Sequence, residues 1–174
     1  MPKNILNYNL VKVYTANILF TSSLLATIMR VFMYLPGGST YYGFPVERTF
    51  EIYGFFILAF ALGIVLFGMF NAYVLSVCNR KKVFAVSVIA LSVFLYVDII
   101  HAYNFVTRLV SMFLMGGFSL LAYSAITTMS IDVTASDCRT KGNILLHITS
   151  LVGMVLSVFV FTVHRYIPFE EAKY

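Results

Sequence analysis

The stretch FEIYGFFILAFALGIVLFGMFNAYVLSV, residues 50–77, decides the fold class of this chain. Its only charged residue is Glu51, which lies at its beginning. An α-helix rises 1.5 Å per residue, so about 20 apolar residues cross a hydrocarbon core of about 30 Å. Residues 50–77 are long enough to cross with some tilt. The stretch therefore predicts a transmembrane α-helix.

Other apolar runs of similar length lie on both sides of this stretch. They cover residues 13–35, 83–103, 109–131 and 144–163. Each run must be helical, because an open strand would leave backbone groups unpaired in lipid. We therefore expect an all-α membrane protein, a polytopic bundle of about five transmembrane helices that forms a single transmembrane domain over residues 1–174.

The composition agrees with a membrane protein. The chain is 60% hydrophobic and 11% charged, against about 45–50% and about 25% in soluble domains. Its net charge of +5 comes from basic residues that cluster between the apolar runs, a pattern typical of topology signals. We expect the lipid bilayer as a partner and no nucleic acid. Two cysteines, Cys78 and Cys138, are too few and too far apart to predict a disulfide framework or a zinc site.

The distribution of Lys and Arg predicts the orientation, because short cytoplasmic loops carry more of both residues. With the N-terminus in the cytoplasm, the inner segments hold Lys3, Lys12, Arg80, Lys81, Lys82, Arg139 and Lys141. The outer segments hold Arg48, Arg108, Arg165 and Lys173. We therefore predict a multi-pass protein of the plasma (bacterial inner) membrane with a cytoplasmic N-terminus.

Small residues in the apolar runs mark candidate helix contacts. At a spacing of four residues they let two helix backbones approach closely. The candidates are Ala59, Gly63, Gly116, Gly117, Gly153 and Ser157. The alternative is chance, since small residues are frequent in membrane helices.

Ionisable residues within or beside the apolar runs are few, and four of them lie at a similar expected depth. They are Arg30, Asp98, His101 and Arg108. Asp98 and His101 are three residues apart and share one helix face. Together the four predict a substrate or proton site facing a cavity, because charges in a membrane mark such pathways. A structural lock, or separate side chains that reach the headgroups, is the alternative.

Motifs of ordinary enzymes are missing from the sequence. It contains no phosphate-binding Walker loop, no H-E-x-x-H and no G-x-S-x-G. We expect no enzyme activity, no catalytic residue, no metal and no cofactor.

The order of these features resembles the N-terminal half of a major facilitator superfamily transporter. The resemblance rests on Pro36-Gly37-Gly38 after the first run, on residues 67–83, on Arg108 followed by Gly116 and Gly117, and on residues 131–143. It implies inner-loop gating residues, namely Arg80, Lys81, Lys82, Asp132 and Arg139. The sequence departs from the family's first loop motif, because Ser76 stands where the family has Asp.

The resemblance covers five of the six helices in that half and implies transport of a small solute as a partial secondary transporter. Alternating access needs one half to rock against another. The expected partners are therefore a second transporter half, a homodimer mate or another membrane subunit. A non-transporting membrane subunit or scaffold is the alternative function.

Overall fold

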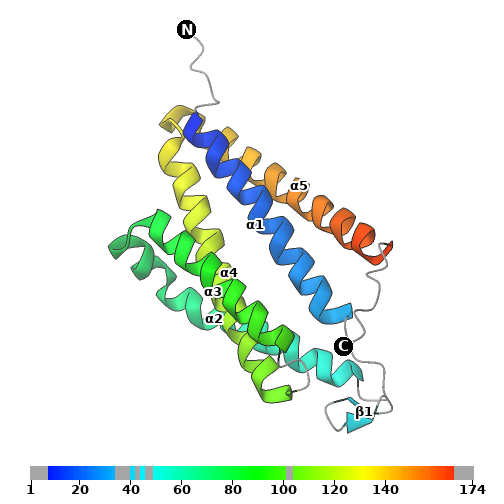
Figure 1. Cartoon of the computed structure of the whole chain (residues 1–174). Helices are drawn as coiled ribbons and strands as arrows, with labels where there is room; N and C mark the ends of the chain where they lie inside the picture. The colour runs from blue at the N-terminus through cyan, green and yellow to red at the C-terminus, as the bar shows by residue number, and fades with distance from the viewer. Residues whose placement is uncertain (1–7, 34–39, 42–43, 46–48, 101–103, 167–174) are drawn as a thin grey trace. The chain divides into compact units, whose positions relative to one another are not determined.

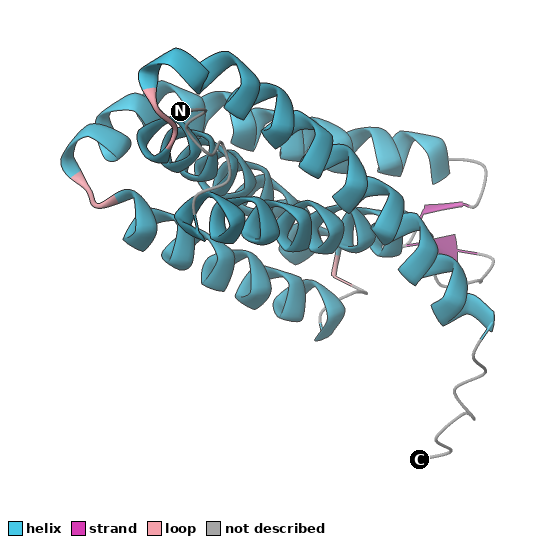
Figure 2. Cartoon of the chain, turned by 90° about the horizontal axis from the view of Figure 1, so that it is seen from above, coloured by secondary structure: helices cyan, strands magenta, loops and turns pink. Residues whose placement is uncertain are grey.

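The computed structural model describes residues 8–33, 40–41, 44–45, 49–100 and 104–166. These residues form five α-helices (Figure 1), namely α1 (Tyr8–Met33), α2 (Thr49–Val77), α3 (Arg80–Ile100), α4 (Phe105–Val133) and α5 (Arg139–Tyr166). A 3₁₀ turn, η2 (Ser136–Cys138), precedes α5, and the short strands β1 (Thr40–Tyr41) and β2 (Phe44–Pro45) pair antiparallel. In Figure 2, helices account for most of the described part of the chain. Five long helices are thus confirmed within these residues, whereas the prediction that all five cross a membrane stays a prediction.

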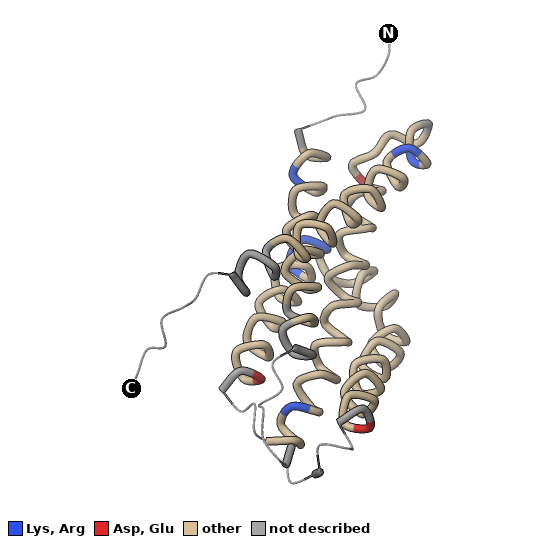
Figure 3. The backbone as a smooth tube through the Cα atoms, turned by 90° about the vertical axis from the view of Figure 1, so that its right-hand side faces the viewer, with Lys and Arg blue, Asp and Glu red and all other residues tan. Residues whose placement is uncertain are grey.

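Several helices are longer than the apolar runs that predicted them. α5 begins at Arg139 rather than at residue 144, and α1 begins at Tyr8 rather than at residue 13. An apolar run measures the part of a helix that suits lipid, whereas backbone hydrogen bonds continue into polar turns. Figure 3 shows the same division, with charged positions near helix ends and long uncharged segments between them.

An asparagine stands directly before the first residue of α3 and of α4. The Lys81 backbone N–H donates to Asn79 Oδ1 at 3.0 Å, and the Thr107 backbone N–H donates to Asn104 Oδ1 at 3.2 Å. An asparagine oxygen at this position satisfies an N–H that has no partner within the helix. These two residues therefore fix where each helix starts.

Three helices in the described part of the chain are long and apolar enough to cross a membrane. The qualifying segments are Glu51–Val77, Phe105–Val133 and Arg139–Phe159. Their length and composition support a helical membrane protein.

The chain divides into two compact units. The first contains residues 1–34 and 130–174, and the second contains residues 35–129. In the first unit α1 packs along α5, and the two helices run side by side in Figure 1. The prediction of one transmembrane domain over residues 1–174 stays a prediction.

The second unit packs α2, α3 and α4 around a small apolar core. Val83 of α3 lies in this core with Leu121 and Ala125 of α4. Aromatic rings extend it, since the Phe118 ring lies 5.3 Å from Phe67 and 5.8 Å from Phe94, measured between ring centroids. The core fixes α4 against both neighbouring helices.

Candidate functional site

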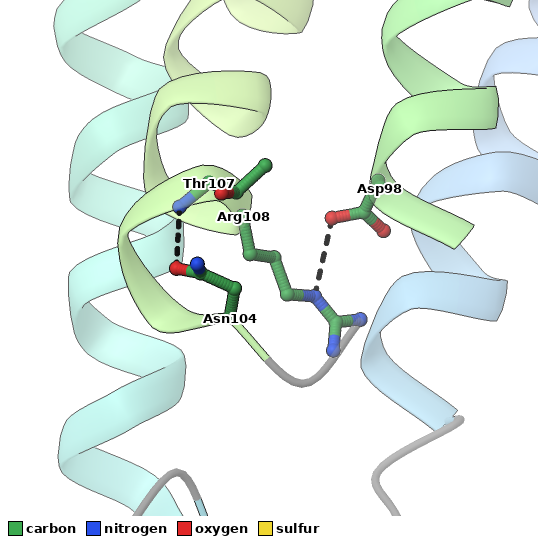
Figure 4. Close-up of polar contacts among 4 residues, drawn as sticks. All are labelled: Asp98, Asn104, Thr107 and Arg108. Atoms are coloured by element: carbon green, nitrogen blue, oxygen red, sulfur yellow. Dashed lines mark hydrogen bonds and ion pairs between the residues drawn. The ribbon is translucent and has the colours of Figure 1, made fainter. Parts of the chain in front are cut away.

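Arg108 and Asp98 form a buried ion pair in the second unit. Asp98 lies near the end of α3, and Arg108 lies in the first turn of α4, directly after the Asn104 cap. Figure 4 shows the Arg108 side chain pointing from α4 toward the Asp98 carboxylate. The Arg108 Nε and Asp98 Oδ1 atoms are 3.3 Å apart, and the two side chains are 3% and 4% exposed.

Each charge of this pair lies at the helix end that disfavours it. The first turn of a helix carries a partial positive charge, which repels the Arg108 guanidinium, and the last turn carries a partial negative charge, which repels the Asp98 carboxylate. Burial adds a further cost for both ions. The two side chains compensate each other, so the pair does not follow from the preferences of either helix alone.

An aromatic ring of α2 lies against the guanidinium, and a ring of α4 packs on it in turn. The Arg108 Cζ atom lies 5.4 Å from the centre of the Phe56 ring, which is a cation–π distance. The Phe105 ring lies 5.6 Å from the Phe56 ring between centroids. Phe56 is almost fully buried. Arg108 therefore contacts α2 through a ring and α3 through an ion.

The other two residues of the predicted network are not placed in this pair. Arg30 belongs to α1, and its side chain lies outside the described structure. His101 also lies outside the described residues. The structure thus brings together two of the four predicted residues, Asp98 and Arg108.

The predicted gating residues lie at helix ends. Arg80 is half-buried, whereas Lys81 and Lys82 are exposed in the first turn of α3. Asp132 is exposed near the end of α4, and Arg139 is exposed at the start of α5. Their gating role remains a prediction.

The small residues lie where helices approach closely. A Cβ atom added to Gly63 would overlap the Phe113 carbonyl oxygen, and one added to Gly116 would overlap the Phe60 carbonyl oxygen. A Cβ on Gly117 would meet the Phe67 ring. These three glycines lie in the contact between α2 and α4. Ala59 in α2 is buried as well.

The first unit contains a polar contact between α1 and α5 that was not predicted from the sequence. Asn17 Nδ2 lies 3.0 Å from the Leu146 carbonyl oxygen and 2.9 Å from the hydroxyl oxygens of both Thr149 and Ser150. The Tyr14 hydroxyl donates to the Gly142 carbonyl oxygen at 3.0 Å. The signal was present as Tyr14, Asn17 and Thr21, three polar residues spaced to share one face of an apolar helix.

Small residues continue this contact along α5. A Cβ atom added to Gly153 would overlap the Thr21 hydroxyl and lie 2.7 Å from the Ile18 carbonyl oxygen. Ser157 is fully buried, one turn further along α5. We name the contacts of Tyr14, Asn17 and Thr21 with α5 the α1–α5 seam.

Comparison with known proteins gives no relative for this chain. No family model matches the sequence, and neither the curated proteins nor the solved structures give a match. Among the described residues, no group of three or more His, Cys, Asp or Glu side chains is placed to hold a metal ion.

Proposed function

We propose that this chain is a subunit of a secondary transporter of the major facilitator type, which moves a small polar solute across the plasma (bacterial inner) membrane. Its N-terminus lies in the cytoplasm, and five helices cross the bilayer. The observation that carries the proposal is the buried Asp98–Arg108 pair. Ionisable groups at membrane depth are rare and costly, and they usually mark a solute or ion pathway.

The surroundings of Arg108 support the same proposal. Arg108 opens α4, and Gly116 and Gly117 follow on the same helix, in the order that the resemblance to the transporter family requires. Close contact through glycines lets α4 pack tightly on α2, which gives the unit a rigid frame. Transport of this type needs a second half that rocks against the first. A second copy of the chain or another transporter half supplies it.

A non-transporting membrane subunit is the second candidate. The ion pair also favours this second candidate, because two buried side chains that neutralise each other can hold α3 and α4 together as a structural lock. In that case the pair contributes to folding and to nothing else. A transporter subunit should lose solute flux when both charges are removed together, whereas a non-transporting subunit has no flux to lose.

The test is solute entry into proteoliposomes that contain the purified chain. Radiolabelled sorbitol, lactate and glycine represent a neutral polyol, an organic anion and an amino acid. We expect one of them to enter faster than into empty liposomes, and we expect Arg108→Ala to reduce entry to the empty rate. Glu51→Gln, which changes an exposed charge at the start of α2, is the matched control and keeps the flux.

A variant without either charge separates the two candidates. Asp98→Leu combined with Arg108→Met keeps the buried volume and leaves no unpaired ion. Loss of flux from this folded double variant supports a role in transport. Full flux from the double variant overturns the role that we assign to the ion pair. Entry of none of the three solutes into wild-type proteoliposomes overturns transport by the chain paired with a second copy of itself.

A further inference from the structure

Asn17 lies fully buried in the α1–α5 seam, and only half of its amide is satisfied. Its nitrogen faces the Leu146 carbonyl oxygen and the hydroxyls of Thr149 and Ser150. Both hydroxyls donate to the same carbonyl oxygen, at 2.8 and 3.1 Å. Each hydroxyl oxygen therefore remains able to accept a hydrogen bond from Asn17.

These contacts fix the orientation of the amide. The Leu146 carbonyl oxygen can only accept, so the amide nitrogen of Asn17 must face it. Oδ1 then points away from this cluster. It is buried, and it accepts no hydrogen bond from any residue that the structure describes. A buried carbonyl oxygen without a donor is unfavourable, so a donor from outside the described structure is expected there.

The chemistry of the seam selects the kind of donor. Every group in the described contacts of Tyr14, Asn17 and Thr21 is uncharged. An ion placed among them would lose its hydration without gaining a counter-ion. A neutral hydroxyl group loses less, because it carries no charge and its O–H donates to Oδ1.

We infer that Asn17 Oδ1 is a binding group for a neutral, hydroxyl-bearing solute. The inference rests on the proposed function, because the bound solute is then the one transported. It also narrows that function. The Arg108 guanidinium is neutralised by Asp98 in this structure, so recognition falls to the uncharged seam rather than to a cation that attracts anions.

The test compares three probes that carry similar hydroxyl groups and differ in charge. Sorbitol is neutral, gluconate is an anion and glucosamine is a cation. The full chain is placed in lipid nanodiscs, and its melting temperature is followed as each probe is added, since a ligand that binds only the folded state raises it. We expect sorbitol to stabilise the wild type and the two charged probes to have no effect.

Two variants separate binding from packing. Asn17→Leu removes both the hydrogen bonds from Asn17 to α5 and the acceptor Oδ1. Thr149→Val combined with Ser150→Ala removes two of these hydrogen bonds and keeps the acceptor. We expect both to lower the melting temperature without ligand. Only Asn17→Leu weakens sorbitol binding, by about tenfold or more, the effect of losing one hydrogen bond to a buried acceptor. Asn17→Ala repeats the comparison if the leucine variant does not fold.

The control is Ser92→Ala, which removes an exposed hydroxyl of α3. If Asn17→Leu and the Thr149→Val, Ser150→Ala variant lose sorbitol binding equally, Asn17 only joins α1 to α5, and the inference is overturned. The inference is also overturned if no probe stabilises the wild type, because a water molecule then donates the hydrogen bond to Oδ1. Binding is measured without transport, so sorbitol binding without flux contradicts the proposed function alone. Flux that survives Asn17→Leu contradicts the inference alone.

Discussion

At the residue scale, the Asp98–Arg108 pair is the arrangement that most needs an explanation. Both side chains are nearly inaccessible, and neither charge is favoured by its own helix terminus. A neutral apolar pair of similar volume would fill the same space at no cost in charge burial. The presence of two ions there is therefore not explained by stability alone.

Removal of one partner should destabilise the second unit strongly. We expect Arg108→Met or Asp98→Leu to lower the free energy of unfolding by about 3–5 kcal/mol, because each leaves a buried ion without its counter-ion. The double variant should recover most of this loss. Unfolding by SDS in mixed micelles, followed by helical circular dichroism, measures all four proteins of the cycle. Additive losses in the double variant would show that the two charges do not interact.

At the scale of the elements, glycines set how closely α2 and α4 pack. Gly63 and Gly116 face backbone carbonyl oxygens of the opposite helix, at Phe113 and Phe60. Backbone atoms cannot rotate away as a flexible side chain can. Even one added methyl group must then push the two helices apart.

The same substitution should therefore have opposite effects at different glycines. Gly63→Ala and Gly116→Ala should each lower the free energy of unfolding by about 1–3 kcal/mol, because overpacking moves the backbone. Gly54→Ala is the matched control in α2, since an added Cβ there meets nothing within 4 Å. It should stabilise the helix by about 0.5–1 kcal/mol through helix propensity. The same SDS unfolding assay applies, and a loss at Gly54 equal to that at Gly63 would contradict the packing argument.

The helices themselves could be predicted from the sequence, because long apolar runs leave no other structure for a backbone in lipid. The run at residues 50–77 matches α2 (Thr49–Val77) almost to the residue. The pairing of the helices could not be predicted, since it depends on contacts between distant residues. The polar face of α1 that contains Asn17 does not show its partner in the sequence, because Leu146 and Ser150 lie more than 120 residues away along the chain. Asp98 and Arg108 could be assigned a similar depth from sequence, but not a distance.

At the scale of the whole molecule, the number of membrane crossings depends on α1 and α3, and α3 is the helix that the two cysteines can test. Its length suits a span, but Arg80, Lys81 and Lys82 occupy its first turn and Asp98 lies near its end. Neither α3 nor α1 is among the three segments that qualify by length and composition within the described residues. The Asp98–Arg108 pair removes part of this difficulty, because a carboxylate next to a guanidinium enters the membrane as half of a neutral pair.

The two cysteines decide whether α3 crosses. Cys78 follows α2 and is exposed, and Cys138 precedes α5 and is half-buried, so α3 and α4 are the helices between them. Two crossings place both thiols on one side of the membrane, whereas one crossing places them on opposite sides. We expect a membrane-impermeant maleimide to label both single-cysteine proteins, Cys138→Ser and Cys78→Ser, in inverted vesicles. Neither should be labelled in right-side-out vesicles, because the excess of Lys and Arg near both thiols belongs to the cytoplasmic side.

The protein in which both cysteines are replaced by serine is the control for labelling of other residues. Labelling of the two thiols from opposite sides would show that α3 does not span, and labelling of both from the outside would reverse the orientation.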